Sequence, residues 1–148
     1  MTLADEDVAI RAQNWCTLAA LHARIEDKLE RALQGSHQLS VREYSVLTVL
    51  AQQDNFHLRM NQLASAVVLS QSATTRLVTR LEERGLLQRY LCADDRRGIY
   101  TEVTEAGQQM LEQARPVNDK ALSEALAEAE QQPEFAPLVK ALAALPQS

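Results

Sequence analysis

The sequence predicts a mainly α-helical chain with one small β-hairpin, and three observations support this fold class. Apolar residues recur at steps of three and four over most of the chain, which is the period of an amphipathic helix. Aromatic residues make up only 4% of the chain, with four glycines and four prolines, which favours helices packed through Leu, Val and Ala over a sandwich of strands. Two short β-type runs flank a single polar turn.

Two helices are expected in the first third of the chain. The first runs from about Glu6 to Leu33 and should end at Gly35 and Ser36. Ser40 is a candidate N-cap with Glu43 three residues later, which is the spacing of a capping box. The segment Val41–Gln52 is therefore predicted as the second helix.

The middle of the chain reads as a pair of short helices followed by a hairpin. After a turn and a very short strand at His57–Arg59, the helices are predicted at Asn61–Val67 and Gln71–Arg84, with Gly85 as the stop. The strands are predicted at Leu87–Cys92 and Ile99–Val103, on either side of a polar tip.

Two further helices complete the chain. Thr104 should cap a long helix that runs to about Gln131 and is kinked by Pro116, and a last helix is expected at Pro137–Leu145. The first and last helices carry apolar stripes that one small subunit has difficulty burying. A second copy of the chain would cover them, so a homodimer is expected, with a monomeric bundle as the alternative.

The charge is distributed unevenly along the chain. The net charge is -5, yet residues 57–103 hold seven basic side chains, all arginine, against five acidic ones. The segments on either side are acidic. A phosphate backbone meets the local field rather than the net charge, so this distribution is compatible with binding to nucleic acid.

The sequence also indicates a cytoplasmic location. It has no apolar run long enough for a membrane span, and it begins with acidic residues where a signal peptide has basic ones. Its two cysteines, Cys16 and Cys92, lie far apart, which suits a reducing compartment.

The predicted helix Gln71–Arg84 has two different faces. Leu77, Val78 and Leu81 fall on one side, with Ala73. Ser72, Thr75, Arg76 and Thr79 fall on the other, and small hydroxyls with a guanidinium are the groups that read base edges in the major groove. An ordinary solvated helix face is the alternative.

The hairpin tip places Asp94, Asp95, Arg96 and Arg97 at a projecting point. The narrow minor groove attracts an inserted arginine, and a neighbouring carboxylate can hold the arginine extended. A charged turn without function is the alternative for this element alone.

These elements together resemble the MarR (multiple antibiotic resistance regulator) family. The resemblance rests on Leu63-Ala64, the serine-rich run Ser70–Ser72, the pair Thr75-Arg76, the segment Arg80–Leu87 and the arginine-bearing tip. Thr104–Gly107 and the Leu39–Tyr44 step also match, so it covers essentially the whole chain. It implies a single domain over residues 1–148, in which a winged helix-turn-helix (about 40–103) is flanked by N- and C-terminal dimerisation helices (about 6–34 and 104–148).

The resemblance also implies a function and a set of contact residues. The function is that of a ligand-responsive transcriptional repressor that binds double-stranded DNA, at a pseudo-palindromic operator, as a homodimer. Arg97 would enter the minor groove, with Asp95 positioning it and Arg96 on the backbone. The remaining DNA-binding candidates are Asn61, Gln62, Ser70, Gln71, Ser72, Thr75, Arg76, Thr79 and Arg80.

The signal that would control such a regulator is less well marked. A small-molecule inducer would lie near Trp15, His22 and Tyr44, although the helical stripe that holds the first two is more typical of core or dimer seam. Cys16 occupies roughly the position of the reactive thiol in hydroperoxide sensors of this family. No charged residue adjoins it in sequence, so a buried structural cysteine is expected, with peroxide sensing as the alternative.

No enzyme, metal or cofactor site is expected. The sequence lacks a glycine-rich phosphate loop, a nucleophile elbow and an HExxH motif, and His22, His37 and His57 have no ligand spacing. The remaining alternative function is a helical protein-interaction module that does not bind DNA, and the acidic net charge is its best support.

Overall fold

The structure is a computed structural model that describes residues 2–92 and 95–147, without the side chains of residues 54, 92 and 95–97. The chain forms two compact units. Leu33–Val117 make the central unit, and Met1–Ala32 with Asn118–Ser148 make the terminal unit. In chain order the elements are α1 (Leu3–His37), α2 (Val41–Ala51), η1 (Asp54–Phe56), β1 (His57–Arg59), α3 (Met60–Ala66), α4 (Gln71–Glu83), β2 (Leu87–Cys92), β3 (Asp95–Val103), α5 (Glu105–Glu130) and α6 (Ala136–Ala144).

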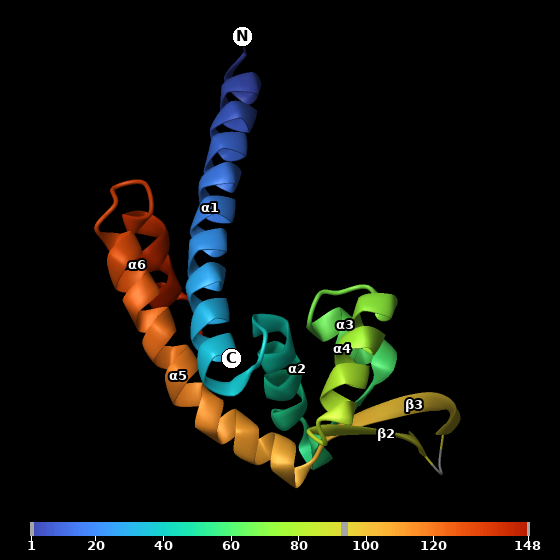
Figure 1. Ribbon diagram of the computed structural model, residues 1–148. Coiled ribbons are helices and arrows are strands. Elements are labelled where there is room, and N and C mark those ends of the chain that lie inside the picture. The colour runs from blue at the N-terminus through green and yellow to red at the C-terminus, as the bar shows by residue number, and fades with distance from the viewer. Residues whose placement is uncertain (1, 93–94, 148) are drawn as a thin grey trace. The chain divides into compact units, whose positions relative to one another are not determined.

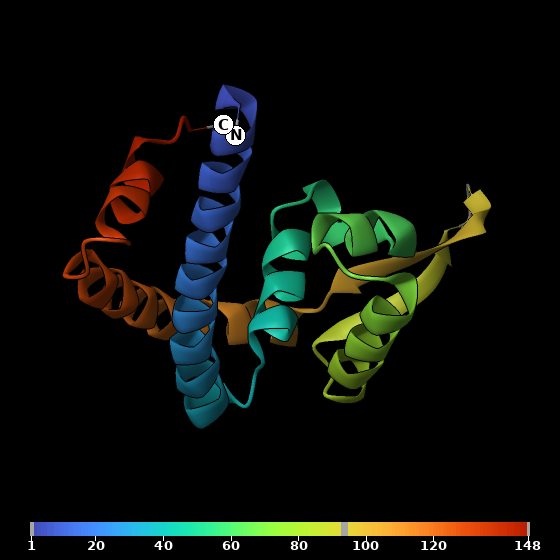
Figure 2. The same cartoon turned by 90° about the horizontal axis from the view of Figure 1, so that it is seen from above.

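The sheet of the central unit has three antiparallel strands in the order β1-β3-β2. Strands β2 and β3 form a hairpin that extends past the ends of α3 and α4 (Figures 1 and 2). The prediction of a mainly helical chain with a small hairpin is confirmed. β3 begins at Asp95, four residues before the predicted start, and a register shift between Leu91 and Cys92 accompanies this extension.

Leucine dominates the core of the central unit. Leu47, Leu50, Leu63 and Leu81 are fully buried, and Leu111 and Ala114 of α5 join the same cluster. Gly107 sits against this core so closely that an added Cβ would lie 2.2 Å from the backbone oxygen of Leu86. The glycine therefore allows α5 to begin directly against the strand that follows α4.

Local signals in the sequence explain most of the helix ends. The Ser40 hydroxyl accepts a hydrogen bond from the Glu43 N–H (3.0 Å), and the Glu43 carboxylate accepts one from the Ser40 N–H (2.9 Å), so the predicted capping box is confirmed. Gly85 has φ +74 and ends α4 as predicted.

The predicted end of the first helix, Leu33, is four residues too early. α1 continues through Gly35 and Ser36 to His37, and Gln38 takes the left-handed position with φ 55. A glycine in the last turn of a long helix costs only about 1 kcal/mol, which is too little to stop propagation. α5 is one helix that contains Pro116, whose missing N–H leaves the Glu112 carbonyl without its helical donor, and the kink expected there remains a prediction.

The terminal unit is held by a small apolar cluster and by ion pairs. Leu21, Ala129 and Phe135 are buried together. Lys28 on α1 lies 2.6 Å from the Glu128 carboxylate and 3.5 Å from that of Glu124, both on α5. Among the described residues, no helix combines the length and apolarity needed to cross a membrane.

Candidate nucleic-acid interface

The geometry of α4 begins at its N-terminal cap. The Ser70 hydroxyl accepts a hydrogen bond from the Ala73 N–H (3.1 Å), as expected for an N-cap serine. The turn that joins α3 to α4 contains Val68, which is 84% exposed and has φ 56. The contact between Ser70 and DNA that the resemblance implies remains a prediction.

One face of α4 is built into the core. Leu77, Val78 and Leu81 are buried, as the helical pattern predicted, and Ala73 is partly buried. Thr74 is fully buried as well, which the pattern did not predict. Its hydroxyl donates to the Ser70 carbonyl (2.9 Å), so the buried polar group is satisfied within the helix.

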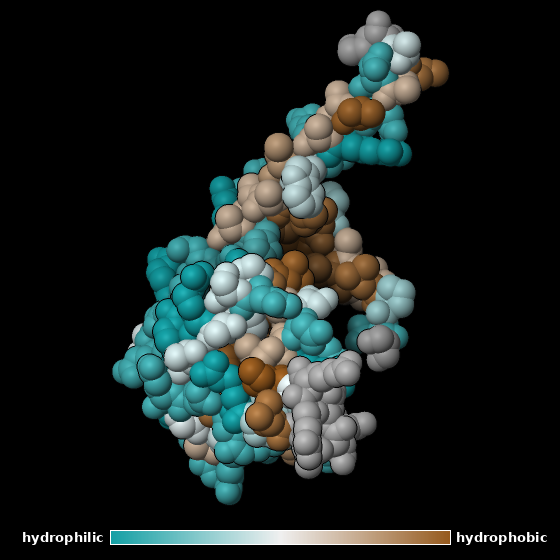
Figure 3. Space-filling model, turned by 90° about the vertical axis from the view of Figure 1, so that its right-hand side faces the viewer, coloured by the Kyte–Doolittle hydropathy of each residue, from teal (hydrophilic) through white to brown (hydrophobic). Residues whose placement is uncertain are grey.

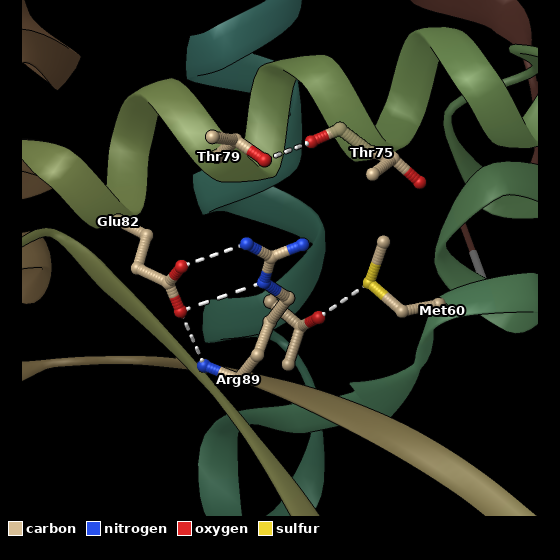
Figure 4. Close-up of polar contacts among 6 residues, drawn as sticks. Met60, Thr75, Thr79, Glu82 and Arg89 are labelled. Atoms are coloured by element: carbon tan, nitrogen blue, oxygen red, sulfur yellow. Dashed lines mark hydrogen bonds and ion pairs between the residues drawn. The ribbon is translucent and has the colours of Figure 1, made fainter.

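The opposite face of α4 is polar and open. Gln71, Ser72, Thr75, Arg76 and Arg80 are exposed and Thr79 is partly buried. The hydroxyl groups of Thr75 and Thr79 donate to the carbonyl groups four residues earlier (2.8 Å each), as Figure 4 shows for Thr79. With their protons committed, these oxygens are set as acceptors, while the nearby guanidinium groups supply donors.

An ion pair fixes the position of α4 against the hairpin. The Arg89 side chain of β2 donates to the Glu82 carboxylate of α4 (2.8 Å), and the Arg89 backbone N–H donates to the same carboxylate (3.0 Å; Figure 4). The hydrogen bonds from Arg89 lower the pKa of Glu82 below its ordinary value. Helix α4 and the β2–β3 hairpin, called the wing from here on, are thereby linked through charge-assisted bonds.

Other predicted contact residues lie at the start of α3 and on the wing. Asn61 and Gln62 are exposed in the first turn of α3, where the Gln62 side chain accepts a hydrogen bond from the Arg59 N–H (3.1 Å). Asp95, Arg96 and Arg97 belong to β3, but their side chains lie outside the described residues. Asp94 lies outside them entirely. The DNA contacts assigned to these residues remain predictions.

A cleft between α4 and the β2–β3 hairpin brings three predicted contact residues together with four residues that the sequence analysis did not select. It is lined by Arg59, Met60, Asn61, Gln71, Thr75, Gly98 and Ile99. Arg59 lies directly opposite Tyr100 in the pairing of β1 with β3, and its Nε donates to the Tyr100 hydroxyl (3.0 Å). This pairing joins residues 41 positions apart, so no local sequence signal could have found it.

The structure does not bring the ligand candidates together within one unit. Trp15 and His22 are exposed on α1 in the terminal unit, where His22 lines an apolar pocket with residues of α6. Tyr44 lies on α2 in the central unit and packs against the leucine core.

Cys16 is exposed, so the expectation of a buried cysteine is wrong for the subunit. The neighbouring turns of α1 are also uncovered. Within the described part of the chain, no three His, Cys, Asp or Glu side chains cluster as metal ligands would.

Comparison with known proteins agrees with this architecture. The sequence model of the MarR family matches residues 39–99. Sco3205 of Streptomyces coelicolor, a MarR family transcriptional regulator solved in complex with DNA, is 27% identical with a TM-score of 0.73, covering 97% of this chain and 88% of that one. The transcriptional regulator BldR of Sulfolobus solfataricus is also 27% identical, with a TM-score of 0.73 over 98% of this chain and 100% of its own.

A third relative has a higher sequence identity to this chain than these two. CouR of Rhodococcus jostii RHA1, solved with bound p-coumaroyl-CoA, is 32% identical with a TM-score of 0.64, over 70% of this chain and 71% of that one. The match to the family model covers the helix-turn-helix and most of the hairpin, and the structural matches extend over nearly all of the chain. The chain belongs to the MarR family of winged-helix transcriptional regulators.

Proposed function

We propose that this chain binds DNA sequence-specifically as a homodimer and acts as a ligand-responsive repressor. In this proposal each subunit inserts α4 into the major groove and places its wing over the adjacent minor groove. The observation that carries the proposal is the composition of α4. Its exposed face holds hydroxyl and guanidinium groups, while Leu77, Val78 and Leu81 on its opposite face are buried.

The electrostatics of the central unit favour the same function. Arg76 and Arg80 are exposed on α4 beside Thr75 and Thr79, and these four residues line a shallow depression on the helix surface. The arginine-rich segment thus directs part of its positive charge outward, although the whole chain is acidic. The DNA complex of Sco3205, a relative of the same family, also supports this proposal.

The wing completes the proposed contact. Arg97 would enter the minor groove, with Asp95 holding it in position and Arg96 contacting the phosphate backbone. Asn61 and Gln62 would contact the backbone from the start of α3. In the first turn of α4, Ser72 would contact a base and Gln71 would bind DNA beside it. The roles on the wing follow from the family resemblance alone, and those at the starts of α3 and α4 are also supported by the exposure of their side chains.

A salt titration with the protein's own upstream DNA tests the proposal. Binding should weaken steeply as salt rises, because phosphate contacts release counterions. Arg76→Ala should weaken binding to the duplex that the wild type binds most tightly by roughly 10- to 100-fold. A bidentate contact with guanine favours that base over the others by about 1–3 kcal/mol. Fluorescence anisotropy of a labelled duplex measures both effects.

The matched control is Arg31→Ala. Arg31 is an exposed arginine on α1, paired with Asp27 in the preceding turn, and its loss removes the same charge far from α4 in sequence. Its affinity should equal that of the wild type. A wild-type protein that shifts no duplex at low salt would favour a protein-interaction module instead.

Ligand control is the second part of the proposal. CouR, which is 32% identical to this chain, was solved with bound p-coumaroyl-CoA, and this relative supports the proposal of ligand control. Trp15, His22 and Tyr44 remain the proposed liners of such a site. The other candidate signal is oxidation of Cys16, which the exposure of its side chain favours. If hydrogen peroxide does not change the affinity of the protein for DNA, this candidate is excluded.

A further inference from the structure

We propose that Leu91 and Ile99 of the wing form an apolar patch that packs against the deoxyribose rings of one DNA strand at the minor groove. The inference rests on the proposed DNA-binding function and adds a contact that carries no charge. The polar residues selected from the sequence would bind phosphates and base edges, whereas this patch would bind the sugars between them.

The two side chains form one continuous patch on the wing. Leu91 of β2 lies directly opposite Ile99 of β3. Residues opposite each other in an antiparallel pair point to the same face of the sheet, with their Cβ atoms about 4.5–5.5 Å apart. Leu91 is 68% exposed and Ile99 is 50% exposed, so the described part of the chain leaves both side chains largely uncovered.

The patch lies on the face of the hairpin that turns toward the helices. Two residues further in along each strand, Arg89 lies opposite Thr101. Arg89 pairs with Glu82 of α4, and Thr101 is fully buried. Because the side chains of a strand alternate between its two faces, Leu91 and Ile99 share this face. They lie nearer the tip, where the hairpin extends past α3 and α4 (Figures 1 and 2).

The patch continues the surface proposed for DNA. Ile99 lines the cleft between α4 and the wing together with Asn61, Gln71 and Thr75, which are predicted contact residues. In the sequence, Ile99 follows two positions after Arg97, the residue proposed for the minor groove. One sugar-phosphate strand separates the major groove from the minor groove. With α4 in the first and the wing in the second, that strand would pass along the face that carries the patch.

Deoxyribose has the chemistry that such a patch would contact. The walls of the minor groove are built from deoxyribose rings, whose C–H groups present apolar edges between the charged phosphates. The groove is only about 6 Å wide, so a side chain at its rim meets sugars before it meets bases. Contact removes apolar surface from water on both partners, which favours binding. Since every nucleotide carries the same sugar, the patch would add affinity without adding sequence preference.

A protein partner fits this patch less well than a DNA strand. A stable protein–protein interface buries roughly 800 Å² on each partner, far more than two partly exposed side chains offer. Charged residues are depleted in the cores of such interfaces. The tip next to the patch in the sequence, however, consists of Asp94, Asp95, Arg96 and Arg97. A small apolar patch beside two arginines matches a strand in which sugars alternate with phosphates.

Two double variants of nearly the same shape test the contact. Leu91→Val with Ile99→Val keeps an apolar patch, and Leu91→Thr with Ile99→Thr replaces one methyl group of each valine by a hydroxyl. Valine and threonine are both β-branched and both suit strands, so the hairpin should form equally well in the two variants. The probe is a labelled duplex of about 30 base pairs from the protein's own upstream DNA, long enough for two half-sites one helical turn apart.

The threonine variant should bind this duplex roughly 10- to 100-fold more weakly than the valine variant, because a dimer loses four apolar contacts. The slope of log affinity against log salt should be the same in both, since no phosphate contact is lost. The heat capacity change of binding, measured by titration calorimetry at several temperatures, should be less negative for the threonine variant. Thermal unfolding monitored by circular dichroism shows that both variants are folded.

Two results separate the inference from the proposed function. Equal affinities of the valine and threonine variants would overturn the sugar contact and leave the proposed function intact, as would a shallower salt slope in the threonine variant. If the wild type binds no duplex at low salt, both the inference and the proposed function fail.

Two further measurements identify what covers the patch. Thymine methyl groups in the major groove are the other apolar groups of DNA, and a duplex with uracil in place of thymine lacks them. The difference between the two variants should persist on that duplex, and its disappearance would assign the patch to bases and overturn the sugar contact. Without DNA, sedimentation velocity should give both variants the same mass. A lower mass for the threonine variant would place the patch between subunits and also overturn the inference.

Discussion

Single residues decide several features of this chain that no periodic pattern contains. Gly107 is required because a side chain there would collide with the Leu86 carbonyl, and Gly85 supplies the positive φ that ends α4. Thr74 is polar but buried, since its hydroxyl finds a partner within its own helix. The surroundings of a single residue therefore decide its burial and its backbone conformation more than its residue type does.

Val68 carries a backbone strain that can be measured. A β-branched residue with φ 56 lies in a region that L-residues avoid, at a cost on the order of 1–3 kcal/mol. Its side chain is almost fully exposed, so little packing offsets that cost. We expect Val68→Gly to raise the free energy of unfolding by about 0.5–1 kcal/mol, after allowance for the greater chain entropy of glycine. Urea denaturation measures the change.

The neighbouring Val67 provides the control for this prediction. It is partly buried against the core and has φ -91, which is an ordinary value for valine. Val67→Gly should therefore lower the free energy of unfolding. If both substitutions destabilise the protein to the same degree, the strain at Val68 does not exist.

At the scale of elements, the Glu82–Arg89 pair joins the proposed recognition helix to the wing. The hydrogen bonds from Arg89 depress the pKa of Glu82 in the folded protein, so this group stabilises the fold above its unfolded pKa. That contribution is lost as the pH falls through the folded pKa. About a third of each side chain is exposed, so the contribution is small, on the order of 0.5–1 kcal/mol.

Glu82→Gln should therefore be less stable than the wild type at pH 7 by about that amount. The difference should shrink in the acid range below about pH 4, where the wild-type carboxylate becomes protonated. Thermal unfolding as a function of pH measures the trend. Glu83→Gln removes the same charge from the next residue, which is exposed, and should change stability little. A difference between Glu82→Gln and wild type that is independent of pH would contradict the role of the ion pair.

At the scale of the whole molecule, the terminal unit has apolar surface that a single subunit leaves uncovered. Figure 3, in which apolar residues are brown, shows such surface along the N-terminal part of α1 at the top of the view and around the hollow beneath it. Leu18, Leu142 and Leu145 are partly exposed, and they line an apolar pocket between α1 and α6. A patch of this kind indicates a binding surface, and a second copy of the chain is the occupant we propose.

Leu142→Asp should therefore convert a dimer into monomers, because it places a charge in a desolvated interface. Sedimentation velocity at micromolar concentration measures the mass in solution. Leu91→Asp makes the same change at an exposed leucine of the hairpin and should leave the mass unchanged. A wild-type protein that sediments as a monomer would rule out the proposed dimer.

The sequence by itself determined the order of the elements, the capping box at Ser40, the stop at Gly85 and the two faces of α4. These features depend on contacts within a few residues, which local patterns record. Only the tertiary structure decided the burial of Thr74 and the pairing of Arg59 with Tyr100. The physical reason is that burial and cross-strand pairing join residues far apart in the chain, and their energies depend on how the elements pack rather than on which residues are adjacent.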